Sequence, residues 1–230
     1  MKKKITALVM AAAMCLSVAA CGSDNGGSGD TAKDTYTVGI CQLVQHDALD
    51  AATKGFRDAL TEELGDKVEF VEQNAANDIP TCGTICNGFV SDGVDLIMAN
   101  ATGALTAAAA ATSDIPILGT SITDYGVALG VDNWTGVSGT NISGTSDLAP
   151  LDGQAAMIQE LFPDAKTIGL LYSNSEANST TPIAEAKAYL DAKGIAYVEK
   201  TGNTNDEIMT AASSMVGQVD AVFTPTDNVV

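Results

Sequence analysis

Histidine is nearly absent from this chain, because His46 is the only one among 230 residues. The scarcity excludes metal sites built on paired histidines. The sequence also lacks the G-x-S-x-G, G-x-x-x-x-G-K-[ST] and G-x-G-x-x-G motifs of nucleophilic serine, phosphate and dinucleotide chemistry. His46 and Asp47 are adjacent, but such a pair more often caps a helix than catalyses a reaction. We therefore expect a protein that is not an enzyme and has no metal or cofactor; a surface hydrolase using His46 or Asp227 is the alternative.

Basic residues are also scarce. The chain has 11 lysines and arginines against 29 aspartates and glutamates, a net charge of −18. If residues 1–20 are removed, three lysines are lost and eight basic residues face 29 acidic ones, which gives −21. A chain of this charge is repelled by nucleic acid. Nucleic-acid binding is therefore excluded.

Long apolar runs are missing apart from one near the N-terminus. Lys2, Lys3 and Lys4 precede the apolar run Ile5–Val18, whose 14 residues fall short of the roughly 20 that span a bilayer. This order predicts a signal peptide over residues 1–20. The junction Val18-Ala19-Ala20-Cys21 resembles a bacterial lipoprotein signal, which implies a diacylglyceryl and palmitate anchor on Cys21. An ordinary cleavage site with a chance cysteine is the alternative.

The segment after Cys21 is rich in glycine and serine, which predicts a flexible tether over residues 21–35. We therefore expect an extracytoplasmic protein held to the cell membrane by its lipid. Cys41, Cys82 and Cys86 remain, and an odd number is no disulfide framework. Cys82 and Cys86 could pair or bind a soft metal, but such cysteines are more often small buried hydrophobic residues.

Short β-branched runs alternate with amphipathic stretches along the rest of the chain. This alternation predicts an α/β fold with parallel sheets covered on both faces. The expected strands are Tyr36–Cys41, Lys67–Glu72, Val94–Ala99, Ile115–Gly119, Thr167–Tyr172, Ile195–Lys200 and Asp220–Thr224. The expected helices are Asp47–Leu64, Ile79–Val90, Ala104–Thr112, Gly153–Phe162, Pro182–Lys193 and Asp206–Val216.

The pattern repeats within the chain. Val38–Cys41 matches Ile168–Leu171, Asn77-Asp78 matches Asn205-Asp206, and Gly93–Ile97 matches Gln218–Val222, each 125 to 130 residues on. We therefore expect two doubly wound lobes, over residues 36–145 and 146–230, joined near Thr140–Asp147. The last expected strand has no helix after it, so we expect the second lobe to be incomplete and the chain to be C-terminally truncated.

Polar residues follow the strand ends, where open parallel sheets bind ligands. Together with these positions, several motifs resemble one family. They are Gly39–Gln42 with His46–Ala52, Gln73–Ala75, Phe89–Asp92, Asp114–Ile117, Ile142–Asp147, Ser173–Ser179 and Pro225–Asn228. They resemble the ABC-transporter substrate-binding proteins related to tryptophan and tyrosine binders, which have the type I periplasmic-binding fold. The resemblance runs from Tyr36 to the end of the chain. Asp47 and Gly103 depart from it, because proline is common at both positions.

The resemblance implies a small amino-acid-like ligand, possibly aromatic, in a cleft between two lobes, with an ABC permease and ATPase as partners. The candidate ligand-binding residues are Gln42, His46, Thr102, Ser121, Thr123, Ser175, Glu176, Asn178, Asp227 and Asn228. Among these, we expect Asp227 to bind an ammonium and the backbone from Ser175 to Ser179 to bind a carboxylate. Asp227 and Ser175 could instead cap helices. A sensor lipoprotein that presents its ligand to a membrane receptor is the alternative function.

Overall fold

The computed structural model describes residues 33–230, the side chains of Asp152 and Ala155 excepted. The predicted signal peptide, the lipid site at Cys21 and most of the tether lie outside these residues. Between residues 33 and 230, no helix combines the length and hydrophobicity needed to cross a membrane.

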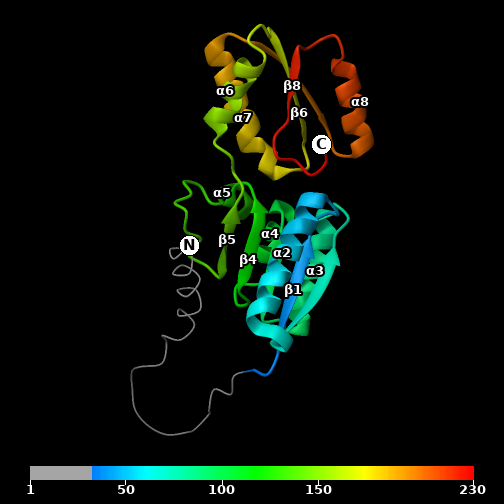
Figure 1. The fold of residues 1–230 in the computed structure, drawn as a ribbon, viewed down its shortest axis with the longest axis vertical. Helices are drawn as coiled ribbons and strands as arrows, with labels where there is room; N and C mark the ends of the chain where they lie inside the picture. Colours follow the sequence, from blue (N-terminus) through cyan, green and yellow to red (C-terminus); the bar gives the residue numbers. More distant parts are fainter. Residues whose placement is uncertain (1–32) are drawn as a thin grey trace. The chain divides into compact units, whose positions relative to one another are not determined.

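The first sheet is entirely parallel and, within the described residues, has five strands in the order β2-β1-β3-β4-β5 (Figure 1). This is the doubly wound arrangement that the sequence predicts. Parallel strands need crossover connections, and helices in these connections cover the faces of the sheet. The strands are β1 (Tyr36–Gln42), β2 (Val68–Asn74), β3 (Leu96–Asn100), β4 (Ile117–Ile122) and β5 (Ile142–Ser146).

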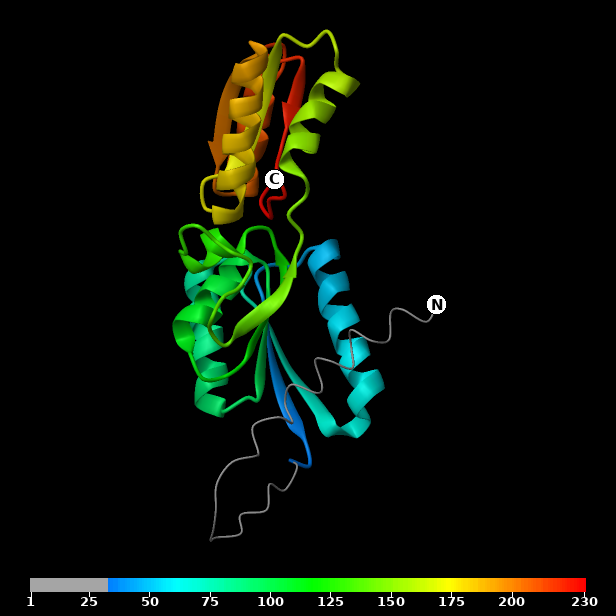
Figure 2. The ribbon, with the colours of Figure 1, turned by 90° about the vertical axis from the view of Figure 1, so that its left-hand side faces the viewer.

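Helices cover both faces of this sheet, with α2 on one side and α3 and α4 on the other (Figure 2). The apolar stripe of α2, Phe56, Leu60 and Leu64, packs against Val38 and Ile40 of β1. On the opposite face, Phe89 of α3 packs directly against Gly39 of β1. A side chain at Gly39 would collide with the Phe89 ring. The elements are α2 (Asp47–Leu64), η1 (Gly65–Lys67), α3 (Ile79–Asp92), α4 (Thr102–Ala111) and α5 (Tyr125–Leu129).

The second sheet is also parallel, with the strand order β7-β6-β8 in the described chain. Its core on one face comes from α6 and α7, and on the other from α8. The elements are α6 (Leu151–Leu161), β6 (Thr167–Ser173), η2 (Ala177–Ser179), α7 (Thr180–Lys193), β7 (Ala196–Gly202), α8 (Asn205–Met215) and β8 (Ala221–Phe223). We call β1–β5 with their helices the first lobe, and β6–β8 with theirs the second lobe.

The predicted internal repeat is confirmed by the equivalent strand orders β2-β1-β3 and β7-β6-β8. Asp95 and Asp220 occupy equivalent positions in the repeated motif and make equivalent hydrogen bonds. The Asp95 backbone N–H donates to Thr37 O (2.8 Å), and its Oδ2 accepts from Thr37 N–H (2.7 Å). Asp220 makes the same two bonds to Thr167, at 2.8 and 2.9 Å. In each lobe an aspartate therefore ties the start of the third strand to the start of the first.

Two elements differ in detail from the sequence expectations. The stretch Thr140–Asp147, near which we expect the lobes to join, contains the strand β5. This strand is polar because it is the exposed edge of the sheet, and a Cβ on Gly144 would lie 2.1 Å from Gly119 O on β4. Helix α8 also differs slightly from the expected Asp206–Val216, because it begins at Asn205, with Thr204 as its N-cap, and ends at Met215. The lobe boundary at residues 145 and 146 stays a prediction.

Candidate functional site

Helix α4 begins at the carboxyl end of β3 with an unusual residue. Its N-cap, Ala101, has φ 85° and ψ 158°, a region that essentially only glycine adopts without strain. No side chain of the described residues caps the helix. The first N–H groups of a helix carry partial positive charge, so an uncapped N-terminus attracts carboxylates. Thr102, a predicted site residue, is the first residue of this helix and is 3% exposed.

Ser121 and Thr123 lie beside this helix start, at the end of β4. Strands β3 and β4 are hydrogen-bonded neighbours, and Ala101 N–H donates to Thr120 O (3.0 Å). Ser121 has φ 56°, the left-handed conformation that few residues other than glycine adopt. Thr123 is buried. Thr102, Ser121 and Thr123 therefore lie together at the carboxyl ends of strands β3 and β4, as the sequence predicts. We call the edge formed by the carboxyl ends of the strands the rim of each lobe.

Gln42 and His46 are used differently from the expectation. The Gln42 amide donates to Asp50 Oδ1 (2.6 Å) and Val44 O (2.9 Å), and its Oε1 accepts from Thr53 Oγ1 (2.7 Å). These bonds hold β1 against α2 and occupy both ends of the amide. His46 is exposed and is the N-cap of α2, with Nδ1 accepting from Ala48 N–H (3.2 Å). Their role in ligand binding stays a prediction.

Asn100, the last residue of β3, is a rim residue that the candidate set omits. It is 0% exposed, and its Nδ2 donates to Leu49 O (2.8 Å) and Thr53 Oγ1 (2.9 Å). Its Oδ1 is buried and has no hydrogen-bond partner in the described part of the chain. A polar residue that ends an apolar strand is the sequence signal, and its burial is visible only in the structure.

In the second lobe, Asp227 joins three segments. Its Oδ2 accepts from the Ser173 N–H (2.8 Å) and the Ser179 hydroxyl (2.6 Å). Its Oδ1 accepts from the N–H groups of Val229 (2.9 Å) and Val230 (3.3 Å). Both carboxylate oxygens are therefore hydrogen-bonded within the lobe. The expected ammonium-binding role of Asp227 stays a prediction, and the geometry assigns it a part in holding the loop after β8.

Glu176, between β6 and η2, is a buried carboxylate beside Asp227. It is 6% exposed, and Asn228 Nδ2 donates to its Oε2 (2.8 Å). Burial raises the pKa of the Glu176 carboxyl, and the negative charge of Asp227 adds to this, whereas hydrogen bonds from the Asn228 and Asn178 amides oppose it. Asn178 Nδ2 also donates to Thr226 O (2.8 Å). The predicted residues Glu176, Asn178, Asp227 and Asn228 thus form one cluster.

The segment from Ser175 to Ser179, expected to bind a carboxylate, differs in conformation from the expectation. The segment forms the short 3-10 helix η2 rather than the first turn of α7. Two of its N–H groups are hydrogen-bonded within the lobe: Ser175 N–H donates to Ser173 Oγ (3.2 Å) and Ser179 N–H to Glu176 O (3.1 Å). Two carboxylates, Glu176 and Asp227, also lie beside it. The role of this segment in binding a ligand carboxylate stays a prediction.

The two rims meet through η2, which contacts α4 and α5 of the first lobe. Next to it, the Thr181 hydroxyl of α7 donates to Asp124 Oδ2 (3.1 Å). The other oxygen of Asp124 accepts from Val127 N–H (3.1 Å) at the N-terminus of α5. The acidic cluster of the second lobe and the uncapped α4 of the first lobe thus belong to segments in contact.

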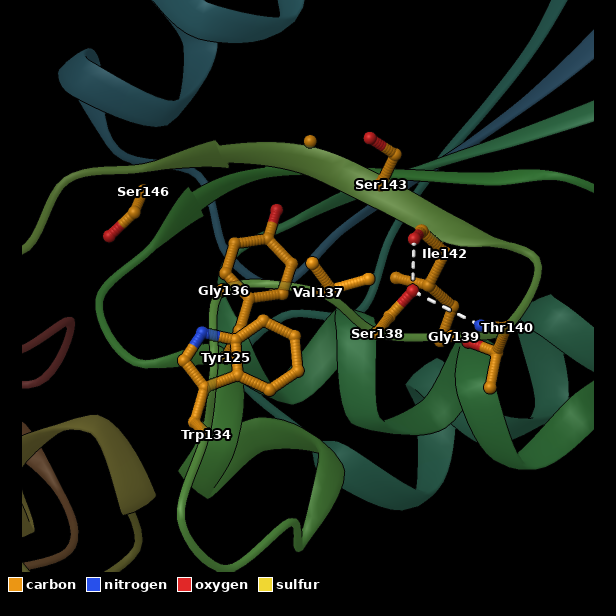
Figure 3. Close-up of a pocket in the computed structure, with 11 residues that line it drawn as sticks. Tyr125, Trp134, Gly136, Val137, Ser138, Gly139, Thr140, Ile142, Ser143 and Ser146 are labelled. Atoms are coloured by element: carbon orange, nitrogen blue, oxygen red, sulfur yellow. Dashed lines mark hydrogen bonds between the residues drawn. The ribbon is translucent and has the colours of Figure 1, made fainter.

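A pocket of about 540 Å³ lies elsewhere, against the edge strand β5. Figure 3 shows the rings of Tyr125 and Trp134 in its wall, stacked with centroids 6.0 Å apart. The Tyr125 hydroxyl donates to Gly119 O (3.1 Å) and Thr145 O (3.2 Å), and burial, with the charge of Asp147, raises the pKa of Tyr125 to about 12. None of the ten candidate residues lines this pocket.

The three cysteines Cys41, Cys82 and Cys86 are free and buried in the core of the first lobe. Hydrogen bonds with the thiols of Cys82 and Cys86, together with burial, raise the pKa of Cys41. Metal ligation requires thiolates, so the environment of Cys41 disfavours it. Over residues 33–230, no cluster of histidine, cysteine and carboxylate side chains has the arrangement of a metal site.

The comparisons with known proteins agree with the family resemblance of the sequence motifs. A model of the ABC transporter substrate binding protein family matches residues 37–230. The chain is 39% identical over 238 residues to the tyrosine-binding protein of Clostridioides difficile, an alignment that covers 99% of this chain and 69% of that protein.

Two solved structures are similar to this fold. One is a conserved domain protein of Vibrio cholerae, with TM-score 0.79 and 30% identity over 84% of this chain. The other is an ABC domain from Streptococcus pneumoniae in complex with L-Trp, with TM-score 0.78 and 35% identity over 85% of this chain. This chain spans 66% of the length of each of these two proteins.

Proposed function

The chain belongs to the ABC transporter substrate-binding protein family, and from this membership we propose that it captures an amino acid outside the cytoplasm for uptake. The ligand lies between the two rims, and closure of the lobes around it stabilises one conformation. An ABC permease with its ATPase then receives the ligand. Members of this family are substrate-binding proteins rather than enzymes, which agrees with the missing catalytic motifs.

The observation that carries this proposal is the uncapped N-terminus of α4. An amino acid has a carboxylate, and the first turn of α4 offers N–H groups with no side chain of the described residues bound to them. Thr102 adds a hydroxyl at the same point, and Ser121 and Thr123 follow the neighbouring strand. The ligand carboxylate therefore binds to the first lobe, not to the Ser175–Ser179 segment of the second.

An aromatic side chain is the proposed preference. Two relatives described above, at 39% and 35% identity, are named for tyrosine or contain L-Trp, and the alignment with the tyrosine-binding protein covers nearly the whole chain. We also infer that the protein is exported by residues 1–20 and held at the membrane by lipid on Cys21. The basis is the order of lysines, apolar run and small residues before Cys21.

The test is a thermal-shift screen of the full-length protein against the amino acids that occur in proteins. At a ligand concentration of about 100 times Kd, binding adds about 2.7 kcal/mol of stability, which gives a clear rise in Tm. L-tyrosine or L-tryptophan is expected to give the largest shift. Thr102→Val should weaken that binding by about tenfold, the effect of losing one hydrogen bond to a charged group. No shift with any amino acid would overturn the proposal.

A further inference from the structure

Three cysteines that the proposed function does not use meet in the core of the first lobe. Cys41 lies in β1, and Cys82 and Cys86 lie one turn apart in α3. All three are free, 0% exposed and members of one core cluster. The Cys41 thiol is hydrogen-bonded to both of the other thiols. Neighbouring thiols are the reactants from which a disulfide bond forms, so this cluster is a candidate site of oxidation.

The packing of α3 on β1 explains why the three side chains meet. Phe89 of α3 lies against Gly39 of β1, where an added Cβ would be 2.7 Å from the ring. Cys41 follows Gly39 by two residues on the same face of the strand, about 6.6 Å further along. A crossover helix runs opposite to its parallel strands and rises about 1.5 Å per residue, so the same length corresponds to about four residues before Phe89. Cys41 therefore faces α3 between Cys86 and Cys82.

Cys82 and Cys86 are poor partners for each other, although they are closest in the sequence. Residues four apart on a helix have Cβ atoms about 5–6 Å apart. A disulfide needs Cβ atoms about 3.5–4.5 Å apart, so a bridge between these two would distort the helix. Cys41 approaches both of them from the sheet. A bridge that fits the fold therefore includes Cys41, and it leaves one thiol over, which accounts for the odd number.

We propose that Cys41 forms a disulfide with one of the two cysteines of α3 when the chain folds in an oxidising compartment, and that the third thiol stays reduced. The oxidant is a small disulfide such as oxidised glutathione. One S–S bond forms in the protein, the S–S bond of the oxidant breaks, and two electrons and two protons pass to the oxidant, which leaves as two thiols. Because the cysteines are buried in the folded protein, this exchange takes place before the core closes. The inference does not depend on which ligand the protein binds.

The bridge joins the end of β1 to α3 directly beneath the rim of the first lobe. Hydrogen bonds already tie the two flanking segments together there. Ala75 N–H donates to Gln42 O (2.9 Å), and Asn77 N–H donates to Leu43 O (2.8 Å). A covalent bond at this point closes a loop of about 40 residues in the unfolded chain, which stabilises the folded state. The oxidised protein should therefore have a higher Tm than the reduced protein.

The test refolds the reduced full-length protein in a mixture of reduced and oxidised glutathione, blocks the remaining thiols with N-ethylmaleimide, and maps tryptic peptides by mass spectrometry. Trypsin places Cys41 on the peptide 34–54 and both cysteines of α3 on the peptide 68–166, so the predicted bridge joins these two peptides. We expect the joined peptides in most of the refolded chains, and this measurement needs no variant. The control is oxidation of the chain in guanidinium chloride, where the shorter loop favours pairing of Cys82 with Cys86 within one peptide.

Cys82→Ala and Cys86→Ala are a matched pair of variants. Each keeps one partner for Cys41 and should still give the joined peptides, whereas Cys41→Ala should give no bridge in the folded protein.

Three results would overturn the inference. The first is N-ethylmaleimide on all three cysteines after refolding in the oxidising mixture. The second is a bridge between Cys82 and Cys86 in the folded wild-type protein. The third is a bridge to Cys41 that lowers Tm, which would show that it does not fit the native packing. None of these results bears on the proposed function, which is tested by ligand binding.

Discussion

At the residue scale, Ala101 holds a backbone conformation that normally requires glycine. Its φ of 85° and ψ of 158° place the alanine Cβ in a strained position at the start of α4. Such strain costs about 1–3 kcal/mol and concentrates at functional sites. It agrees with the proposal that this helix start binds the ligand carboxylate.

Ala101→Gly should therefore stabilise the protein, by about 1 kcal/mol once the greater freedom of glycine in the unfolded chain is included. The free energy of unfolding, measured by chemical denaturation, checks this. Ala110→Gly, at an exposed helical position of the same helix, is the control and should destabilise by about 1 kcal/mol. Equal losses from both variants would show that Ala101 is not strained.

Individual site residues show which features of the site can be predicted from the sequence alone. Thr102, Ser121 and Thr123 lie where the strand ends predict, because the position of a rim follows from the order of strands and helices. The roles of Gln42, Asp227 and Ser175 do not follow from that order. They depend on hydrogen bonds to residues distant in sequence, such as the 2.7 Å bond from Thr53 to Gln42. No local pattern encodes such partners.

At the element scale, β5 is a strand that the sequence does not predict. Predicted strands are recognised by runs of β-branched residues, and Ile142–Ser146 contains two serines, a threonine and a glycine. The element forms because β4 offers it a parallel partner and because Gly144 permits the close approach of Gly119 O. The strongly periodic α2, in contrast, has the predicted bounds, since its apolar stripe is local information.

Gly144→Ala should consequently destabilise the protein. The added Cβ would lie 2.1 Å from Gly119 O, and φ at this position is 151°. Overpacking and backbone strain together predict a loss of about 3 kcal/mol. Gly55→Ala is the matched control, since nothing lies within 4 Å of its Cβ in α2, and it should stabilise by about 1 kcal/mol. Urea denaturation of both variants measures the difference; a neutral Gly144→Ala would refute the packing of β5 on β4.

Asp220, which links the start of β8 to the start of β6, should make the stability of the protein depend on pH. Hydrogen bonds from the backbone of Lys166 and then Thr167 lower the pKa of Asp220 below its usual value of 3.8. Because the folded state has the lower pKa, this stabilisation is present above pH 3.8 and is lost as the pH falls below it.

Asp220→Asn should therefore reduce the loss of stability between neutral pH and about pH 3. Unfolding free energies measured across that range check the slope. Asp164→Asn, an exposed aspartate of the loop before β6 for which the described chain records no side-chain hydrogen bond, is the control. If both variants keep the wild-type slope, the bonds from Lys166 and Thr167 do not contribute.

At the scale of the whole molecule, the two sheets share one plan, which the offsets of about 125 to 130 residues in the sequence already indicate. The plan places strand ends of both lobes at rims that meet through η2. Family membership agrees with this architecture, since its solved relatives superpose with TM-scores of 0.78 and 0.79. A shared plan of two lobes is thus predictable from sequence, whereas the complementary charges of the two rims require the structure.

Export and anchoring also belong to this scale. Cys21→Ser should move the protein from the membrane fraction into the medium or the soluble fraction, because a serine cannot carry the thioether-linked lipid. Fractionation followed by immunoblotting measures the change, with Cys41→Ser as the control that should remain with the membrane. A Cys21→Ser protein that stays in the membrane fraction would rule out the lipid anchor.

We propose that the two rims together form one amino-acid site. A calorimetric titration of the full-length protein with L-tyrosine tests this. We expect one site per chain and a Kd of about 10 µM or tighter, which corresponds to roughly −7 kcal/mol. If neither L-tyrosine nor any other amino acid bound with a Kd below about 1 mM, roughly −4 kcal/mol, the two rims would not form such a site.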